Sequence, residues 1–294
     1  MWYIAFCIVL TSYLTLAFKM LGNLKINSFQ AIVFNYITCV ITGSIFTGGF
    51  PLNKHTFSEP WLIWGVVMGL LFVSVFNLIA WCARTAGVSI TSVANKLSLV
   101  IPFILSVYLY GEEINFLNIL GILLALVSVV LVCYPSAKME GGQPQGSKSK
   151  AVWILPVILF ICSGLLDSML KYVESNFITR EHYNAYLVTT FLSAATGGSL
   201  LLLYQYISGI QKFSGKALLA GVLIGIPNYF SIWTLLKALE SFPGKSAMVI
   251  PVNNMGIVLF SAIAAWFIFK EKLSMLNKAG IVLALLAIGL IAFG

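Results

Sequence analysis

The sequence predicts an all-α integral membrane protein with ten transmembrane helices, arranged as two inverted five-helix repeats. Three observations lead to this prediction: the composition, the recurrence of long apolar runs, and a similarity between the two halves of the chain. Of the 294 residues, 60% are hydrophobic and only 9% are charged, whereas a soluble domain needs far more charge on its surface. The runs are continuously apolar, which excludes a membrane barrel, because barrel strands alternate apolar and polar residues.

Apolar runs of about 18 residues can cross roughly 30 Å of hydrocarbon, and such runs recur along the whole chain. Charged residues, glycine and proline mark their ends. The first run has no basic segment before it, so we expect a retained helix rather than a cleaved signal. These crossings predict a multi-pass protein of the cell (inner or plasma) membrane. The ten predicted helices are 1–18, 28–47, 61–83, 88–110, 115–134, 151–173, 184–207, 216–239, 245–269 and 274–293.

The two halves of the chain are similar, most clearly near their ends. Residues 110–134 align without gaps on residues 269–293, a shift of 159, and nine of the 25 positions are identical. Leucine and alanine identities are common in membrane helices, so the polar and glycine matches carry the weight. These matches are Glu112/Glu271, Asn118/Asn277, Gly121/Gly280 and Asn95/Asn254 at a shift of 159, and Gly65/Gly221 and Gly69/Gly225 at a shift of 156.

A polar stretch near the middle, "PSAKMEGGQPQGSKSK" (135–150), is rich in Gly, Ser, Pro and Lys and is predicted to be a flexible linker. It separates a first five-helix repeat, 1–134, from a second, 151–294. An odd number of crossings leaves the chain on the opposite side of the membrane, so the second repeat must be inverted. Inverted repeats are typical of secondary transporters, whose substrate site lies near the bilayer midplane.

The fifth and tenth predicted helices carry almost no polar residues, and each has a Gly-x-x-x-Ala pair that permits close helix approach. We expect these two helices to be peripheral supports. The other eight hold the asparagines at membrane depth, and we expect them to line a cavity, because polar side chains rarely face lipid.

Lys96 is a candidate substrate-binding residue about eight residues inside the predicted helix 88–110. Asn95 and several Ser and Thr residues share its half of the helix circumference, and apolar residues fill the other half. A charge at this depth is costly unless it faces a wet path, which favours a place on the translocation route. The alternative is a lysine that snorkels or bonds to backbone carbonyls.

Asp167 supplies the opposite charge, on the predicted helix 151–173. Ser163, Asp167 and Lys171 follow an i, i+4, i+8 spacing on one face. Asp167 either forms an intrahelical ion pair with Lys171, binds a cationic group, or carries a proton.

Further polar and aromatic residues at helical spacing complete the candidate site. Each asparagine alone is equally consistent with a role in joining helices. In "VIPVNNMG" (249–256) a proline precedes two asparagines, which predicts a broken helix lining a cavity, with Pro251 and Gly256 as a hinge. The remaining substrate-binding candidates are Asn35, Asn77, Trp81, Tyr229, Trp233, Asn253 and Asn254.

The duplicated "GEEINFLNILGILLAL" (111–126) and "KEKLSMLNKAGIVLAL" (270–285), with Lys19 and Lys171 at the ends of the first and sixth helices, resemble the EamA-type branch of the drug/metabolite transporter superfamily. The resemblance covers the whole chain. It implies a transporter of small organic solutes, often an exporter, with a cavity between two inverted halves. The family's substrates range from amino acids and sugars to amines and drugs, so it does not identify the solute.

The predicted function is secondary-active transport by alternating access. Lys96 would attract a carboxylate or phosphate and Asp167 an amine or proton, a combination that suits a zwitterion such as an amino acid. A channel and a membrane-embedded enzyme are the alternatives, although His55 and His182 are isolated and no metal or nucleophile constellation is present.

The expected partners are a small-molecule solute and the lipid bilayer. Coupling of transport to a proton is an alternative that the sequence leaves open. The net charge of +8 comes from single Lys and Arg residues in short connections, which indicates loop charge rather than nucleic-acid binding. We expect no cofactor and no obligatory protein partner. Orientation stays open: loop lysines and arginines favour external termini, whereas the resemblance implies cytoplasmic ones.

Overall fold

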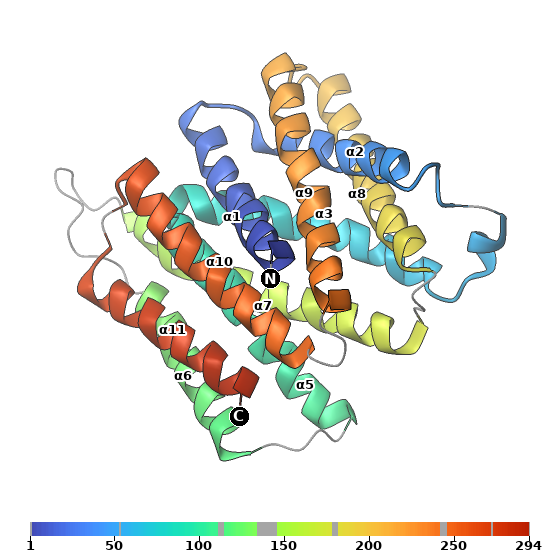
Figure 1. Cartoon of the computed structure of the whole chain (residues 1–294). Helices are drawn as coiled ribbons and strands as arrows, with labels where there is room; N and C mark the ends of the chain where they lie inside the picture. Colours follow the sequence, from blue (N-terminus) through green and yellow to red (C-terminus); the bar gives the residue numbers. More distant parts are fainter. Residues whose placement is uncertain are drawn as a thin grey trace. The chain divides into compact units, whose positions relative to one another are not determined.

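A computed structural model describes residues 2–52, 54–110, 115–133, 146–177, 182–241, 246–271 and 273–293 of the chain (Figure 1). Within these ranges it contains eleven α-helices, one short 3-10 helix and no strand. The helices are α1 (Trp2–Asn23), α2 (Ser28–Phe46), α3 (Leu62–Thr85), α4 (Val88–Leu97), α5 (Val100–Tyr110), α6 (Phe116–Cys133), α7 (Gly146–Phe177), α8 (Tyr183–Ile207), α9 (Gly215–Ser241), α10 (Ser246–Phe269) and α11 (Met275–Phe293), and the 3-10 helix is Lys54–Ser58.

The all-helical class and the membrane character agree with the sequence prediction. Every predicted helical range holds a helix, and 88–110 holds two. Among the described residues, seven helical segments are long and apolar enough to cross a membrane, and one of them, Val88–Leu105, combines α4 with the first part of α5. The apolar segments of α6, α7 and α11 are shorter. Most of the predicted linker, 135–145, lies outside the described residues. Its last five residues, 146–150, are helical and belong to α7.

The predicted helix 88–110 is interrupted at Ser98 and Leu99, between α4 and α5. Pro102 accounts for the interruption, because a proline has no N–H and its ring collides with the carbonyl four residues earlier. That carbonyl belongs to Ser98, and it accepts instead from the N–H of Ile101 at 2.9 Å. The Ser98 hydroxyl donates to the Asn95 carbonyl at 2.6 Å and satisfies part of the end of α4.

The prediction of a broken helix at Pro251 is wrong. Helix α10 runs without interruption from Ser246 to Phe269. Prolines also lie inside the continuous helices α7 and α9, at Pro156 and Pro227. Neighbouring helices and local adjustments can make up for the lost backbone hydrogen bond within a membrane, so a proline alone does not show where a span breaks.

The chain forms two compact units, and each combines segments from both halves of the sequence. Unit 1 comprises Met1–Lys19, Leu78–Leu165 and Ser231–Gly294, and unit 2 comprises Met20–Asn77 and Leu166–Phe230. Helices α1, α3, α7 and α9 contribute to both units.

In unit 1, α6 and α11 lie side by side (Figure 1), and both pack on α4. The predicted close approach at Gly121 and Gly280 is confirmed: an added Cβ would lie 2.8 Å from Ile291 and 2.6 Å from Val132, respectively. The N-terminal part of α6 thus meets the C-terminal end of α11, and the N-terminal part of α11 meets the C-terminal end of α6. The two helices are therefore antiparallel.

In unit 2, the two Gly-x-x-x-Gly motifs also pack across the halves of the sequence. At Gly69 of α3, an added Cβ would lie 2.3 Å from the Thr190 carbonyl oxygen of α8. At Gly225 of α9, it would lie 2.5 Å from Thr38 Cβ of α2. Each motif packs against the second helix of the other half, at a distance that excludes any side chain.

Candidate functional site

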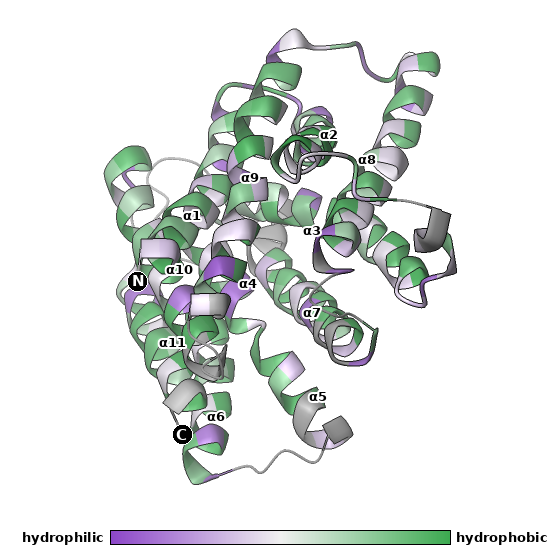
Figure 2. Cartoon of the chain, turned by 45° about the vertical axis from the view of Figure 1, so that its right-hand side comes forward, coloured by the Kyte–Doolittle hydropathy of each residue, from purple (hydrophilic) through white to green (hydrophobic). Residues whose placement is uncertain are grey.

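Lys96 lies in the last turn of α4, not in the middle of a long helix. Figure 2 shows purple, hydrophilic ribbon next to the α4 label. The interruption after Leu97 leaves the last carbonyls of α4 without intrahelical partners, and a helix C-terminus favours a cation. The half-buried Lys96 side chain has no ion-pair partner among the described residues.

The Cys7 thiol of α1 is the centre of a buried polar cluster in unit 1. Its Sγ donates to the Ser231 carbonyl at 3.3 Å and lies 3.8 Å from the Thr11 hydroxyl oxygen, and the side chains of Thr234 and Asn253 lie near it. Lys96 is close enough to act on this thiol electrostatically. We call the set the Cys7 cluster: Cys7, Thr11, Lys96, Ser231, Thr234 and Asn253.

Helix α10 packs on α4 and brings the predicted asparagines to this part of unit 1. Asn253 is 3% exposed, and its Oδ1 has no hydrogen-bond partner among the described residues. A buried carbonyl oxygen without a donor costs about 1–3 kcal/mol, so this atom can accept from a bound molecule. Asn254 is also buried and Asn95 is half-buried.

The two predicted tryptophans of unit 1 differ in their surroundings. Trp233 is half-buried, with its ring edge-to-face on Tyr3 at a centroid distance of 6.0 Å. Trp81 is 51% exposed and is not part of the Cys7 cluster.

In unit 2, Asn35 joins α2 to α9. Its Oδ1 accepts from Asn228 Nδ2 at 3.1 Å, and the neighbouring Cys39 Sγ donates to the Gly225 carbonyl at 3.3 Å. Asn35 is completely buried. Its surroundings are those of a helix-joining residue, the alternative that the sequence left open.

The other predicted residues of unit 2 are separate from this pair. Tyr229 is buried, and its ring fills the space beside Gly43, where an added Cβ would lie 2.8 Å away. The half-buried Asn77 donates to Val73 of its own helix at 2.7 Å. Asp167 is half-buried on α7, whereas the side chain of its predicted partner Lys171 lies outside the described residues.

The predicted hinge residue Gly256 is a contact point between α1 and α10. An added Cβ there would lie 2.2 Å from Ile8 Cδ1. The glycine thus lets α1, which carries Cys7 and Thr11, approach the helix that carries Asn253.

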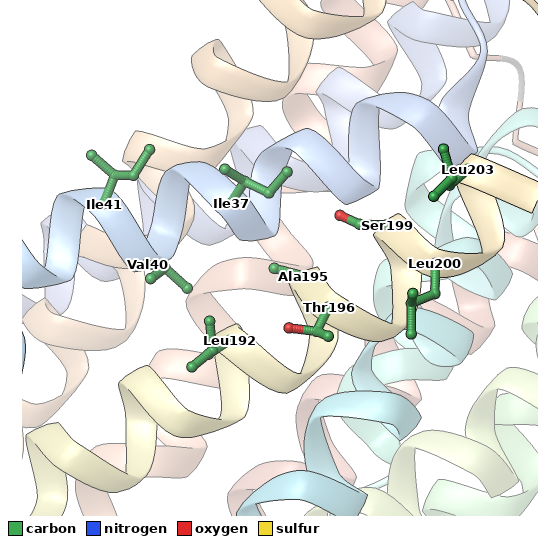
Figure 3. A pocket seen from close by; sticks show the side chains of 9 residues that line it. All are labelled: Ile37, Val40, Ile41, Leu192, Ala195, Thr196, Ser199, Leu200 and Leu203. Atoms are coloured by element: carbon green, nitrogen blue, oxygen red, sulfur yellow. The ribbon is translucent and has the colours of Figure 1, made fainter. Parts of the chain in front are cut away.

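A groove of 390 Å³ lies along α2 and α8 in unit 2 and contains none of the predicted residues (Figure 3). Only two of its lining side chains are polar, and none is charged, so it offers nothing to a charged solute. The lining residues are Ile37, Val40, Ile41, Leu192, Ala195, Thr196, Ser199, Leu200 and Leu203.

Sequence reasoning missed Cys7, Thr11 and Thr234. Cys7 and Thr11 are spaced i, i+4 on the first helix, a signal that could have placed them on one face. Their approach to Lys96 and Asn253 depends on the packing of α1, which the sequence alone does not give.

Comparison with known proteins agrees with this architecture. The model of the EamA-like transporter family matches residues 1–134 and 149–293. An uncharacterized protein from Haemophilus influenzae (strain Rd) is 27% identical over 265 residues, which cover 88% of this chain and 86% of that protein. A solved crystal structure has a TM-score of 0.63 and 15% identity, covering 98% of this chain and 94% of the other, a likeness that concerns the fold alone.

The family match covers both halves of the sequence and nearly every residue. Its members are membrane transporters of small solutes, in agreement with the apolar helices. This multi-pass membrane protein belongs to the EamA-like transporter family.

Proposed function

We propose that the protein is a secondary-active carrier that moves small charged organic solutes across the cell membrane by alternating access. One observation carries the proposal: the span α4–α5 is interrupted, and Lys96 lies at the interruption. In secondary transporters, discontinuous helices place their ends at the substrate site near the bilayer midplane.

The proposed layout is ten crossings in two inverted repeats, and the contacts of α6 and α11 support it. Asn118 Nδ2 donates to the Ile291 carbonyl at 3.4 Å, and Asn277 Nδ2 donates to the Val132 carbonyl at 2.8 Å. These two hydrogen bonds are equivalent in the repeat, because at the shift of 159 Asn118 corresponds to Asn277 and Val132 corresponds to Ile291. Such an equivalence between antiparallel helices is expected where a twofold operation relates two oppositely oriented copies.

The Cys7 cluster suggests the chemistry of the solute. The Lys96 ammonium would bind a carboxylate or phosphate, and the open acceptor Asn253 Oδ1 would take an N–H or O–H donor of the same molecule. An amino acid or a similar charged metabolite fits both. Asp167 is proposed to receive a cationic group or a coupled proton, and export is proposed from the family resemblance alone.

Counterflow in proteoliposomes tests the carrier mechanism. Vesicles preloaded with candidate metabolites should accelerate uptake of the same labelled solute, and the rate should saturate. Flux that rises linearly with concentration and shows no counterflow would indicate a channel. Conversion of the solute to a product in sealed vesicles would indicate an enzyme.

Lys96→Met tests the site. We expect transport to fall by at least about tenfold, which corresponds to about 1.4 kcal/mol, with normal amounts of folded protein. Lys96→Arg keeps the charge and should retain part of the activity. Lys216→Met removes an exposed lysine of α9 and serves as the matched control. Full transport by Lys96→Met would remove Lys96 from the mechanism.

A further inference from the structure

Glu271, just after α10, joins three helices at one end of unit 1. It forms an ion pair with Lys19 of α1. Its carboxylate also accepts from the Val88 N–H at 2.8 Å, the Ser89 N–H at 3.3 Å and the Ser89 hydroxyl at 3.0 Å, at the start of α4. The Glu271 side chain is only 9% exposed and that of Lys19 only 17%.

This carboxylate caps α4 from a distant part of the chain. The first N–H groups of a helix lack intrahelical partners, and the residue before α4, Gly87, has no side chain to supply one. A carboxylate at a helix N-terminus is also favoured by the helix dipole. Gly87 has φ +101°, a conformation that favours glycine, and an added Cβ would lie 3.0 Å from Glu271 Oε1.

Lys19 completes the arrangement. Its ammonium pairs with Glu271 and lies 4.9 Å from the ring centroid of Phe269, within the range of a cation–π interaction. Lys19 and α4 belong to the first half of the sequence, whereas Glu271 and Phe269 belong to the second. The contacts therefore tie the two halves together, at the end of the helix that carries Lys96 two turns further on.

We propose that Lys19, Glu271 and the N-terminus of α4 form a latch that closes one face of the carrier and opens when that face admits the solute. The inference rests on the proposed alternating-access mechanism. In that mechanism the two halves move against each other, and Glu271 in the second half cannot stay bound to α1 and α4 in the first half when the halves separate at this face. An opened latch exposes two charges and the first N–H groups of α4, and these groups require water. Opening therefore creates a wet path at this face.

Thiol labelling tests the latch without a solute. Thr15, one turn before Lys19 on the same face of α1, is buried and serves as the probe position in Thr15→Cys. Reconstituted protein is treated with a membrane-impermeant maleimide from each side, and modification at residue 15 is read by peptide mass spectrometry, so the native cysteines can remain. When Glu271→Gln is introduced into the Thr15→Cys protein, the labelling rate from one side should rise by at least about tenfold, which corresponds to about 1.4 kcal/mol.

Lys270→Gln is the matched control, because it removes an exposed charge beside Glu271, and labelling should stay at the parent rate. If Glu271→Gln lowers the melting temperature too far for labelling, Lys19→Gln replaces it with the same expected increase. Unchanged labelling in whichever of these variants is folded overturns the latch.

The charge-swapped pair Lys19→Glu/Glu271→Lys separates a simple ion pair from the proposed latch. It restores opposite charges but puts an ammonium at the N-terminus of α4, so labelling should stay fast. A return to the slow parent rate would overturn the role of the α4 cap. If the protein transports a solute but Glu271→Gln does not change the labelling rate, the latch alone is refuted. If Glu271→Gln speeds up labelling but the parent protein transports no solute, the proposed function is refuted.

Discussion

Asn118 and Asn277 each use both ends of one side-chain amide. The oxygen of Asn277 accepts from the Ser274 N–H at 3.1 Å, at the start of its own helix, while its Nδ2 donates to the end of the other helix. Asn118 does the same with the Asn115 N–H at 3.2 Å and Ile291. Both ends of an α-helix leave backbone groups unsatisfied, and one asparagine therefore serves two helix ends.

Asn277→Ala should lower the free energy of unfolding by about 1–3 kcal/mol, because it removes a helix cap and leaves a buried carbonyl without its donor. Thermal unfolding in detergent measures the effect. Lys278→Ala, at the next and exposed position, should change little. Equal melting temperatures for the Asn277→Ala and Lys278→Ala proteins would contradict this role.

The sequence repeat drew attention to Asn118 and Asn277 but did not give their role. Gapless alignment can identify a repeated polar residue, whereas the helix end that receives its amide depends on tertiary packing. The same limit applies to Lys96. Its charge and depth could be read from the sequence, but its place at a helix C-terminus follows from the interruption at Ser98 and Leu99.

At the scale of elements, the positions of the helices were predictable because lipid imposes long apolar runs. The interruption was not, because in the part of the chain that the structure describes α5, α7, α9 and α10 each contain a proline, and only the span α4–α5 is broken there. Whether a neighbouring group replaces the lost hydrogen bond decides the outcome. At Pro102 the Ser98 carbonyl accepts from Ile101 instead, and the helix ends there.

Pro102→Ala should restore the missing N–H and favour one continuous helix, since alanine is about 3 kcal/mol more favourable than proline in a helix interior. We expect a higher melting temperature together with reduced transport, because Lys96 would no longer lie at a helix end. Pro156→Ala in the continuous helix α7 is the comparison, and it should leave transport near the parent rate. Undiminished transport by Pro102→Ala would separate the interruption from the function.

The glycine contacts of α3 and α9 exclude any larger residue. Gly69→Ala and Gly225→Ala should each destabilise the fold by about 1–3 kcal/mol through overpacking, since backbone oxygens lie 2.3 and 2.7 Å from the added Cβ atoms. Gly289→Ala in α11 meets nothing within 4 Å and should be neutral or slightly stabilising, because alanine favours the helix. Equal melting temperatures for all three variants would argue against these close contacts.

At the scale of the whole molecule, close contacts join helices from different halves of the sequence. Helix α3 packs on α8, α9 packs on α2, and α6 packs on α11. Matching residues in the two halves indicated a duplication, but they could not show which helices pack together. A glycine motif looks the same in the sequence whether its partner helix lies in its own half or in the other half. Both copies of the glycine motif could be recognised in the sequence, whereas the helices that they pack against could not be predicted from it.

These contacts predict that the halves stay together when the chain is cut between them. A protease site inserted between residues 140 and 145, in the predicted linker, should allow complete cleavage while both fragments elute as one particle in mild detergent. The contacts between the halves bury close-packed helix faces, and small residues at such faces favour association in lipid. The intact chain fixes the elution position.

Gly69→Leu with Gly225→Leu should make the cleaved fragments separate, because both close contacts in unit 2 are lost. Gly289→Leu, whose position faces open space, controls for the added apolar volume and should leave the cleaved pair intact. Fragments that separate without any glycine substitution would mean that each half is held mainly by its own contacts. If the cleaved protein stays in one particle and still shows counterflow, the interactions that hold the halves together lie in the helices. The linker then serves only to join the two copies in one chain.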